Sequence, residues 1–163
     1  MNKFWLNNFA IDDFIKSALK EDFYWGDITT DAICANLENP NFDVYLTTRN
    51  DGILAGRQVF ERVFKILSED KVKVEFYFSD GDEIKKGDKI AHISGDARFI
   101  LTGERLALNF VQKMSGIATY TRKFQEKIDK YGVHIVDTRK NTPILRHFEK
   151  YSVKRSQLIF LFV

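Results

Sequence analysis

A short apolar run near the end of the chain, VHIVD at residues 133–137, constrains the fold more than any other feature. Gly132 ends the helical pattern before it, and the run is typical of a strand that is buried on both faces. Such strands belong to parallel sheets, which need neighbouring strands and covering helices. Residues 133–163 suffice for one strand–loop–helix unit, whereas a closed α/β barrel needs roughly 200–250 residues. The sequence therefore predicts only the first βα unit of an incomplete α/β barrel.

The part of the chain before this run has a mixed pattern of helices and strands. Apolar spacing predicts helices over about 10–20 and 57–68. Alternation of polar and apolar residues predicts strands at 42–46 and 72–78. The stretch 21–33 contains a glycine and several short polar residues, and it predicts a loop.

Turn signals connect these elements. Asp51-Gly52 predicts that residues 53–56 (ILAG) return as a second strand. Residues 80–96 resemble the hammerhead of lipoyl- and biotinyl-type domains, with short strands around glycines that suit tight turns: Gly81, Gly87 and Gly95. Residues 99–130 predict two helices, because small residues interrupt the pattern, and Ser115 is expected to cap the second.

The predicted fold class is therefore α+β. We expect an N-terminal mixed α/β sandwich of the hammerhead-like kind over residues 1–114. The start of the barrel domain is expected over residues 115–163, with a short helix from Pro143 to about Tyr151.

Composition excludes several classes of protein. The 25 basic and 23 acidic residues give a net charge of +2, which argues against nucleic-acid binding and makes any anion site local. No run approaches the roughly 18 apolar residues of a membrane span, and the N-terminus lacks the pattern of a signal peptide. The single cysteine, Cys34, is expected to be buried and fits a reducing, cytoplasmic compartment. The tail QLIFLFV (157–163) has the composition of aggregating segments.

One polar stripe stands out on the predicted central helices. Arg105, Asn109 and Gln112 share a face of an otherwise mostly apolar helix. Spacing alone favours an ordinary solvated face, on which Arg105 pairs with Glu104 or another acid.

The run DTRKNTP directly follows the predicted strand, which places Asp137 to Thr142 at its carboxyl end. In α/β barrels that end usually carries the active site. Arg139 can bind a carboxylate through two N–H groups, and Lys140 supplies a point charge. A basic surface loop explains the pattern equally well.

The remaining polar candidates are weaker. Arg146 and Lys150, four residues apart, form a second potential cationic face. His92 and His134 lie in predicted strands and are expected to be structural. His147 has no Cys or second His at ligand spacing, so no metal-binding and no catalytic residue is assigned.

Six segments in order resemble one family, the quinolinate phosphoribosyltransferases. They are ALKEDFYWGDITTDAI (18–33), DGDEIKKGDKIAHISGDAR (80–98), GERLALNF (103–110), SGIATYTR (115–122), VDTRKNTP (136–143) and LRHFEKYSV (145–153). Each motif alone is weak, but six in family order are specific. ModD-like proteins of molybdenum transport operons share the fold and some motifs, although the ERLALN and SGIAT forms favour the quinolinate enzymes.

The resemblance implies a cytoplasmic, homodimeric pentosyltransferase of NAD biosynthesis. Such an enzyme converts quinolinate and phosphoribosyl pyrophosphate into nicotinate mononucleotide, carbon dioxide and pyrophosphate, with Mg²⁺ accompanying the pyrophosphate. By resemblance, Arg105 extends into the partner subunit's site, and Thr138, Arg139 and Lys140 bind substrate. Since both substrates are polyanions, this chemistry depends on positioned cations more than on a nucleophile.

The chain departs from the family pattern at three places. Asn141 stands where the family usually has Thr, and Ile144 where it usually has Gly, a residue that tolerates a positive φ as Ile does not. After Lys154 the family continues into further substrate-binding segments, whereas this chain continues as RSQLIFLFV. We therefore expect a truncated product with an out-of-frame tail near Arg155 and negligible activity alone. The alternatives are a non-catalytic fragment that pairs with a full-length subunit, and a ModD-like protein.

Overall fold

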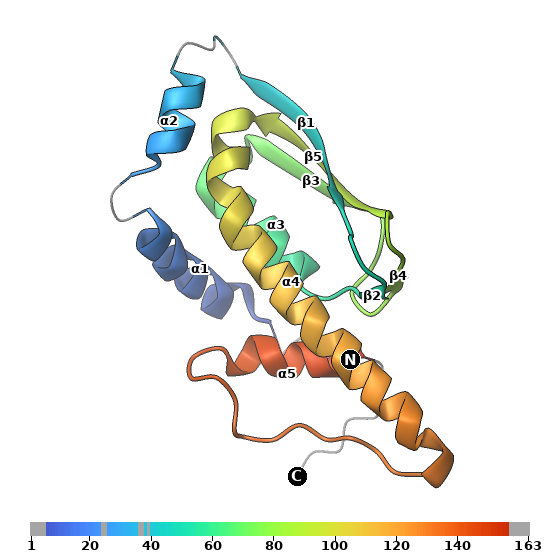
Figure 1. Cartoon of the computed structure of the whole chain (residues 1–163). Helices are drawn as coiled ribbons and strands as arrows, with labels where there is room; N and C mark the ends of the chain where they lie inside the picture. Colours follow the sequence, from blue (N-terminus) through green and yellow to red (C-terminus); the bar gives the residue numbers. More distant parts are fainter. Residues whose placement is uncertain (1–5, 24–25, 36–37, 39, 157–163) are drawn as a thin grey trace.

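The computed structural model describes residues 6–23, 26–35, 38 and 40–156 (Figure 1). Its helices are α1 (Asn8–Asp22), α2 (Ile28–Cys34), α3 (Arg57–Ser68), α4 (Ala97–Ile128) and α5 (Arg146–Arg155), and the 3-10 turn η1 (Asp129–Tyr131) follows α4. Its strands are β1 (Asn41–Thr47), β2 (Gly52–Ile53), β3 (Val72–Phe76), β4 (Glu83–Ile84) and β5 (Lys89–Asp96). This mixture confirms the α+β class, and the expected tail segment 157–163 lies outside the described residues.

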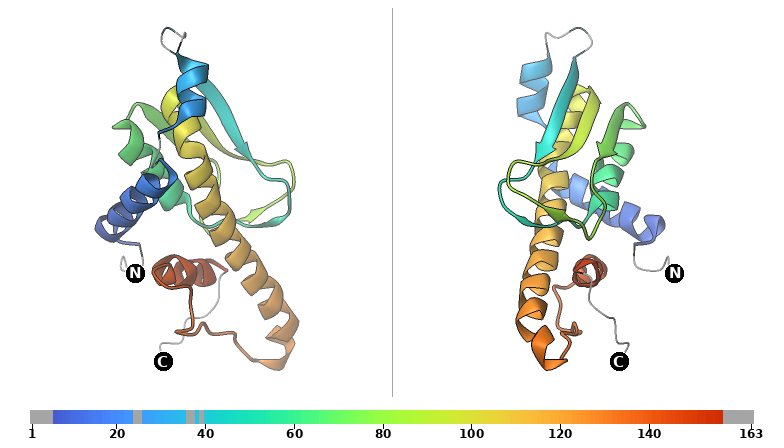
Figure 2. Two further views of the ribbon diagram at one scale, coloured as in Figure 1. Left: turned by 60° about the vertical axis from the view of Figure 1, so that its left-hand side comes forward. Right: turned by 90° about the vertical axis from the view of Figure 1, so that its right-hand side faces the viewer.

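A three-stranded antiparallel sheet in the order β1-β5-β3 forms one layer of the fold. Its register aligns Val44 with Ile93 and Ile93 with Val74, so a row of apolar side chains crosses one face. Helices α3 and α4 lie along that face (Figures 1 and 2). The other face carries the alternate, polar positions. Both strands predicted from alternation are therefore confirmed.

The glycines of residues 80–96 differ in role. Gly81 and Gly87 lie in turns with φ of 103° and 94°, as predicted. Gly95 lies inside β5 instead, with φ of 135°. A Cβ there would lie 2.2 Å from the carbonyl oxygen of Lys71, so this strand position has no room for any side chain.

The prediction that residues 53–56 return as a second strand is only partly confirmed. The strand β2 is only Gly52–Ile53, and it pairs with β4 rather than with β1. The neighbour of β1 is β5, which is longer and supplies a full register. The strand β2 also lies against α4, where the amide of Ile53 donates a hydrogen bond to Thr119 Oγ1 at 2.9 Å.

The core forms between α3, α4 and the sheet. The amphipathic pattern predicted α3 correctly, and its apolar face is fully buried through Val59, Phe60, Val63 and Phe64. The helix α1 packs against α3 and contributes the buried side chains of Ile11 and Ile15 to the core, as its helical spacing predicted. The helix α4 approaches α3 closely at Gly103, where a Cβ would lie 2.8 Å from the Phe64 ring.

Residues 97–128 form one continuous helix, so the prediction of two helices with Ser115 as an N-cap is wrong. The hydroxyl of Ser115 instead donates to the carbonyl oxygen of Ala55 at 3.1 Å and accepts from its amide at 3.0 Å. Ser115 thus satisfies backbone groups of a neighbouring segment. Small residues in this helix allow close packing and do not mark a break.

The C-terminal unit was predicted only in part. Gly132 ends the helical region with φ of 66°, and α5 follows Pro143, both as expected. Residues 133–137, however, are extended but are not a strand, and His134 is exposed rather than buried. A parallel strand needs neighbours for its hydrogen bonds, and the described part of the chain provides none.

Three aromatic rings join α5 to the rest of the molecule. Phe148 of α5 lies 5.1 Å from Phe14 of α1 and 5.3 Å from Phe110 of α4, measured between ring centroids. Phe14 and Phe110 are themselves 5.8 Å apart with an edge-to-face geometry, which is favourable for aromatic pairs. The unit that follows α4 is therefore packed onto the N-terminal helices.

Candidate functional site

The stretch 21–33 was predicted to be a loop, but the helix α2 begins within it. Asp27 stabilises the first turn of this helix. Its side chain caps α2 by accepting a hydrogen bond from the Thr30 amide at 3.0 Å. It also accepts from the hydroxyls of Thr30 at 2.6 Å and of Thr102 at 2.8 Å, which connects α2 to α4. The hydrogen bond from the Thr30 hydroxyl is the largest influence on the pKa of Asp27 and lowers it. Partial burial would raise this pKa, but the hydrogen bonds outweigh it, and the Arg105 charge lowers it slightly further.

Arg105 lies beside this capped helix, at the edge of a cleft of about 420 Å³ between α2 and α4. One guanidinium nitrogen, Nη1, is 3.1 Å from Oδ1 of Asp22. The acidic partner is thus Asp22 rather than Glu104. The Arg105 side chain is 75% exposed, so the rest of its guanidinium faces solvent and the cleft. Asn109 and Gln112 are exposed too, as the polar stripe predicted.

Thr138, Arg139 and Lys140 lie in the loop between η1 and α5. The Lys140 amide donates to Thr138 Oγ1 at 3.0 Å, which is a local turn contact. All three residues are exposed, and neither cation has an acidic partner among the described residues. Two positive charges without a counter-ion on one turn can attract a small anion, and Arg139 can bind a carboxylate through two N–H groups.

The same loop is fixed to α5 by one ion pair and one hydrogen bond. Lys150 Nζ lies 2.7 Å from Oδ1 of Asp137, and both side chains are mostly buried. Lys150 is therefore not part of a free cationic face with Arg146, contrary to prediction. Glu149 accepts from the Thr142 amide at 3.1 Å and lies 3.6 Å from Lys113. Burial alone would raise the pKa of Glu149, but these contacts outweigh it and lower that pKa.

Ile144 occupies the position where the resemblance places glycine. Its φ is 70°, in the left-handed region that β-branched residues rarely adopt. The loop thus keeps a glycine-type conformation without glycine, and the Ile144 side chain is 78% exposed.

The predicted site residues lie in two places in this chain. Arg105 stands at the α2–α4 cleft, whereas Thr138, Arg139 and Lys140 lie in the loop between η1 and α5 (Figure 1). The residues that line the α2–α4 cleft come from 22–33 and 101–105, so the turn at 138–140 does not contribute to it. Their assignment to one substrate site stays a prediction.

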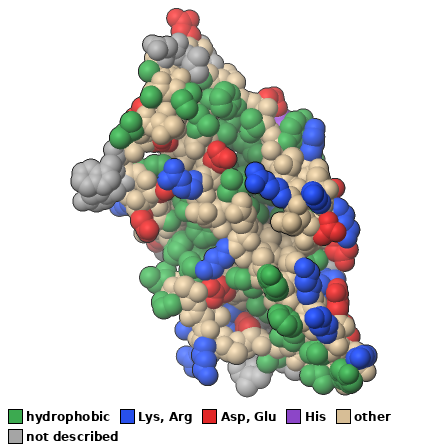
Figure 3. Space-filling view, in the orientation of Figure 1, with side chains coloured by type: hydrophobic (Ala, Val, Ile, Leu, Met, Phe, Trp, Pro, Cys, Tyr) green, Lys and Arg blue, Asp and Glu red, His purple; other side chains and the backbone are tan. Residues whose placement is uncertain are grey.

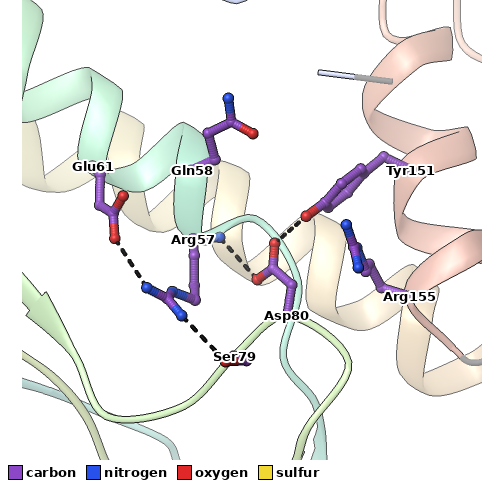
Figure 4. A pocket seen from close by; sticks show the side chains of 7 residues that line it. All are labelled: Arg57, Gln58, Glu61, Ser79, Asp80, Tyr151 and Arg155. Carbon is purple, nitrogen blue, oxygen red and sulfur yellow. Dashed lines mark hydrogen bonds and ion pairs between the residues drawn. The ribbon is translucent and has the colours of Figure 1, made fainter. Parts of the chain in front are cut away.

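A second cleft, of about 270 Å³, lies between the start of α3 and α5 (Figure 4). Asp80 is at its centre, because its carboxylate accepts from the Arg57 amide at 3.1 Å and from the Tyr151 hydroxyl at 2.5 Å. Burial, followed by the Asp80 charge, raises the pKa of Tyr151. Arg57 and Arg155 carry as many charges as Asp80 and Glu61, so the cleft has no excess of either sign.

The remaining candidates are structural. Cys34 is buried, as predicted. His92 lies in β5 and contacts Asp43 of β1. Among the described residues no three His, Cys, Asp or Glu side chains gather as metal ligands, and no helix there has the length and apolar character to span a bilayer.

Sequence reasoning missed the Asp27 contacts. The signal was present, because Asp immediately before a stretch with helical apolar spacing is typical of a helix N-cap. The contact with Thr102 had no local signal, since the two residues are far apart in sequence.

Comparison with known families gives two adjacent matches. Residues 27–115 match the family model described as quinolinate phosphoribosyl transferase, N-terminal domain. Residues 117–156 match the corresponding C-terminal domain. Both matches lie partly on α4, which runs without interruption across the boundary between them.

Individual relatives agree with these matches. A probable nicotinate-nucleotide pyrophosphorylase (carboxylating) of Bacillus subtilis is 35% identical over 149 residues, which are 91% of this chain and 50% of that protein. A mitochondrial quinolinate phosphoribosyltransferase (decarboxylating) of Nicotiana tabacum is 37% identical over 147 residues, covering 89% and 40%. Among solved structures, NadC of Streptococcus pyogenes has a TM-score of 0.87 at 41% identity, covering 93% of this chain and 54% of that one. The chain thus spans about half the length of the curated relatives it matches.

Proposed function

The chain belongs to the quinolinate phosphoribosyltransferase family, and from this premise we propose that it carries a quinolinate-binding part of such an enzyme. The complete reaction joins quinolinate to phosphoribosyl pyrophosphate and releases pyrophosphate and carbon dioxide, which leaves nicotinate mononucleotide. The observation that carries the proposal is the exposed pair Arg139 and Lys140, which has no acidic partner within the described part of the chain.

In this proposal Arg139 and Lys140 contact the two carboxylates of quinolinate. A planar guanidinium matches a carboxylate with two parallel hydrogen bonds, and an ammonium adds a second charge nearby. Thr138 orders the turn by accepting a hydrogen bond from the Lys140 amide, and the two cations are neighbours on that turn. Such positioning is what a reaction between polyanions requires.

Arg105 has a different proposed role. Its side chain is exposed and held on one edge by Asp22, so its outer edge is available to a second molecule. We propose that it extends into the substrate site of a partner subunit in a homodimer. This role is supported by the absence of residues 138–140 from the lining of the cleft beside Arg105 in one chain.

Two parts of the proposal concern the surroundings of the reaction. Mg²⁺ is proposed to accompany phosphoribosyl pyrophosphate, because this ion is usually bound through substrate phosphates. The proposed compartment is the cytoplasm. The names of the relatives reported above do not favour a ModD-like function.

Titration of the isotope-labelled chain with quinolinate tests the carboxylate contacts. We expect the backbone amide signals of Arg139 and Lys140 to shift on addition of quinolinate. Arg139→Ala should weaken binding roughly tenfold or more, since a charge-assisted hydrogen bond contributes about 1.5–3 kcal/mol. The control Arg49→Ala removes an exposed cation elsewhere and should leave binding unchanged.

Equal loss in both arginine variants, or no shift at Arg139 and Lys140, would contradict the assignment. A separate assay for nicotinate mononucleotide with this chain alone should show negligible turnover. Robust turnover would show that the residues present suffice for catalysis, against expectation.

A further inference from the structure

The cationic turn 138–140 lies between two points that α5 fixes. On one side, Asp137 forms an ion pair with Lys150 at 2.7 Å. On the other side, the Thr142 amide donates a hydrogen bond to Glu149 Oε2 at 3.1 Å. Because Glu149 and Lys150 are consecutive residues of α5, one turn of this helix holds both ends of the cationic part of the loop.

The acids nearest to this turn in sequence each have a lysine partner. Residues 133–156 contain two acids, Asp137 and Glu149, whose side chains are 13% and 14% exposed. Lys150 pairs with the first, and Lys113 lies 3.6 Å from the second. The other oxygen of Asp137, Oδ2, is buried and accepts no hydrogen bond from the described residues. Both acids are therefore occupied away from the turn.

Asp137 is the acid that would otherwise neutralise the turn. It precedes Arg139 by two residues. Two residues of extended chain span at most about 7 Å, which is less than the screening length of about 10 Å at about 0.1 M salt. An unpaired carboxylate at this distance competes with any anion for Arg139. The ammonium of Lys150, itself only 18% exposed, compensates this charge instead.

The ion pair and the turn differ in their exposure to water. Thr138, Arg139 and Lys140 are all exposed. Figure 3 shows basic side chains at the surface in the lower part of the molecule, where the loop before α5 lies in Figure 1. Partial burial strengthens the attraction within the Asp137–Lys150 pair, because the surrounding dielectric is lower than that of water. The exposed cations stay available to a ligand.

We propose that Lys150 is a positioning residue for substrate binding, because it holds the Asp137 carboxylate away from Arg139 and Lys140. Lys150 acts through Asp137 and does not contact the ligand. Glu149 supports it by fixing the other end of the turn. This inference rests on the proposed function for the identity of the ligand, quinolinate, whereas the pairing of Asp137 can be measured without any ligand.

Two variants of the ion pair test the proposal by titration with quinolinate. Lys150→Met keeps an apolar stem but removes the ammonium, so Asp137 loses its partner. We expect it to weaken quinolinate binding about fivefold or more, since a full negative charge is released within about 7 Å of Arg139. Adding Asp137→Asn to Lys150→Met removes both charges, and the affinity should then return to within about twofold of that of the unmodified chain.

A milder variant and a matched control accompany this pair. Lys150→Gln keeps a hydrogen-bond donor for the carboxylate, which preserves the fold more gently, and should also bind more weakly than the unmodified chain. Arg146→Met removes an exposed cation one turn earlier on the same helix and should leave the affinity unchanged. The ratio between the unmodified chain and Lys150→Met should shrink as salt is added, because a screened carboxylate competes less. A loss of fold would not respond in this way.

A measurement without ligand separates this inference from the proposed function. The Nε–H signal of Arg139 in the isotope-labelled chain responds to a charge-assisted hydrogen bond with a carboxylate. It should shift in Lys150→Met and return to its original position when Asp137→Asn is added. If quinolinate does not bind even to the unmodified chain, the proposed function fails, while these signals still decide the role of Lys150.

An unchanged Arg139 signal in Lys150→Met would overturn the proposal, and so would equal losses of affinity in Lys150→Met and Arg146→Met. A double variant that binds as weakly as Lys150→Met would also overturn it, since Lys150 would then contact the ligand directly or support only the fold.

Discussion

Replacing Gln125 with leucine removes the side chain that holds the extended segment to α4. Gln125 is 6% exposed, and its carboxamide bonds Asp129, Val133 and Ile135. Leucine has a similar size but no polar atoms, so Gln125→Leu deletes these three hydrogen bonds with little change in packing volume.

The expected loss follows from these contacts. Each hydrogen bond contributes about 1 kcal/mol net, so three give about 3 kcal/mol. The carbonyl of Val133 and the side chain of Asp129 lie near the surface and regain water, and burial of leucine adds stability. We therefore expect a net loss of about 1–2 kcal/mol in the free energy of unfolding, with most of the change local to residues 133–137.

Urea unfolding and amide exchange measure the two parts of this effect. The urea midpoint should fall in Gln125→Leu, and the Ile135 amide should exchange faster than in the unmodified chain. The control is Gln112→Leu, the same change at an exposed position of the same helix, which should alter stability by less than about 0.5 kcal/mol. An unchanged Ile135 exchange rate in Gln125→Leu would refute the role given to this amide.

Three further changes test other parts of the fold. Ile144→Gly should stabilise the chain by about 0.5–1 kcal/mol in thermal unfolding, because it relieves a positive φ at a β-branched residue despite the added chain entropy; a lower melting temperature would contradict this. Gly95→Ala should cost more than about 2 kcal/mol, since the new Cβ meets the Lys71 carbonyl, and a stability like that of the parent would mean that the strand adapts. Asp27→Ala should cost about 1 kcal/mol near neutral pH. Because the folded-state pKa of Asp27 lies below its usual value of 3.8, its stabilisation exists above that value and is lost as the pH falls through the folded pKa; urea titrations of both forms should therefore converge on acidification, and a constant gap would contradict the role of the charge.

Elements whose stability comes from their own amphipathic pattern were predictable from sequence. The helix α3 begins and ends as predicted, because its buried residues Val59, Phe60, Val63 and Phe64 follow helical spacing without interruption. The strand β3 was equally clear, since alternation of apolar and polar residues at period two is typical of a half-buried strand.

Elements that depend on distant partners were not predictable. In sequence, Ser115 resembles the first residue of a helix. Its hydroxyl instead forms hydrogen bonds with the backbone of Ala55, which is distant in sequence and which no local pattern connects to Ser115. The run 133–137 has the composition of a buried strand, yet composition cannot supply the neighbouring strand that its hydrogen bonds need. In both cases the sequence has the local pattern of the predicted element, but contacts with residues distant in sequence determine the structure that forms.

The candidate site shows the same division. Arg105, Arg139 and Lys140 were predicted from pattern and resemblance to bind substrate, which stays a prediction, and the structure shows all three side chains exposed. The ion pair between Lys150 and Asp137 was not predicted, because the i, i+4 spacing of Lys150 with Arg146 suggested a shared face. Spacing describes neighbours on one helix, whereas the acid that pairs with Lys150 comes from the preceding loop.

The uninterrupted course of α4 has a mechanical consequence. Its 32 residues make a stiff rod of about 48 Å at 1.5 Å per residue. A tilt of about 5° at one end would displace the other by about 4 Å, more than the length of a hydrogen bond. The helix crosses α3 closely at Gly103 and Phe64, so a larger side chain at this crossing would tilt α4 and displace its far end.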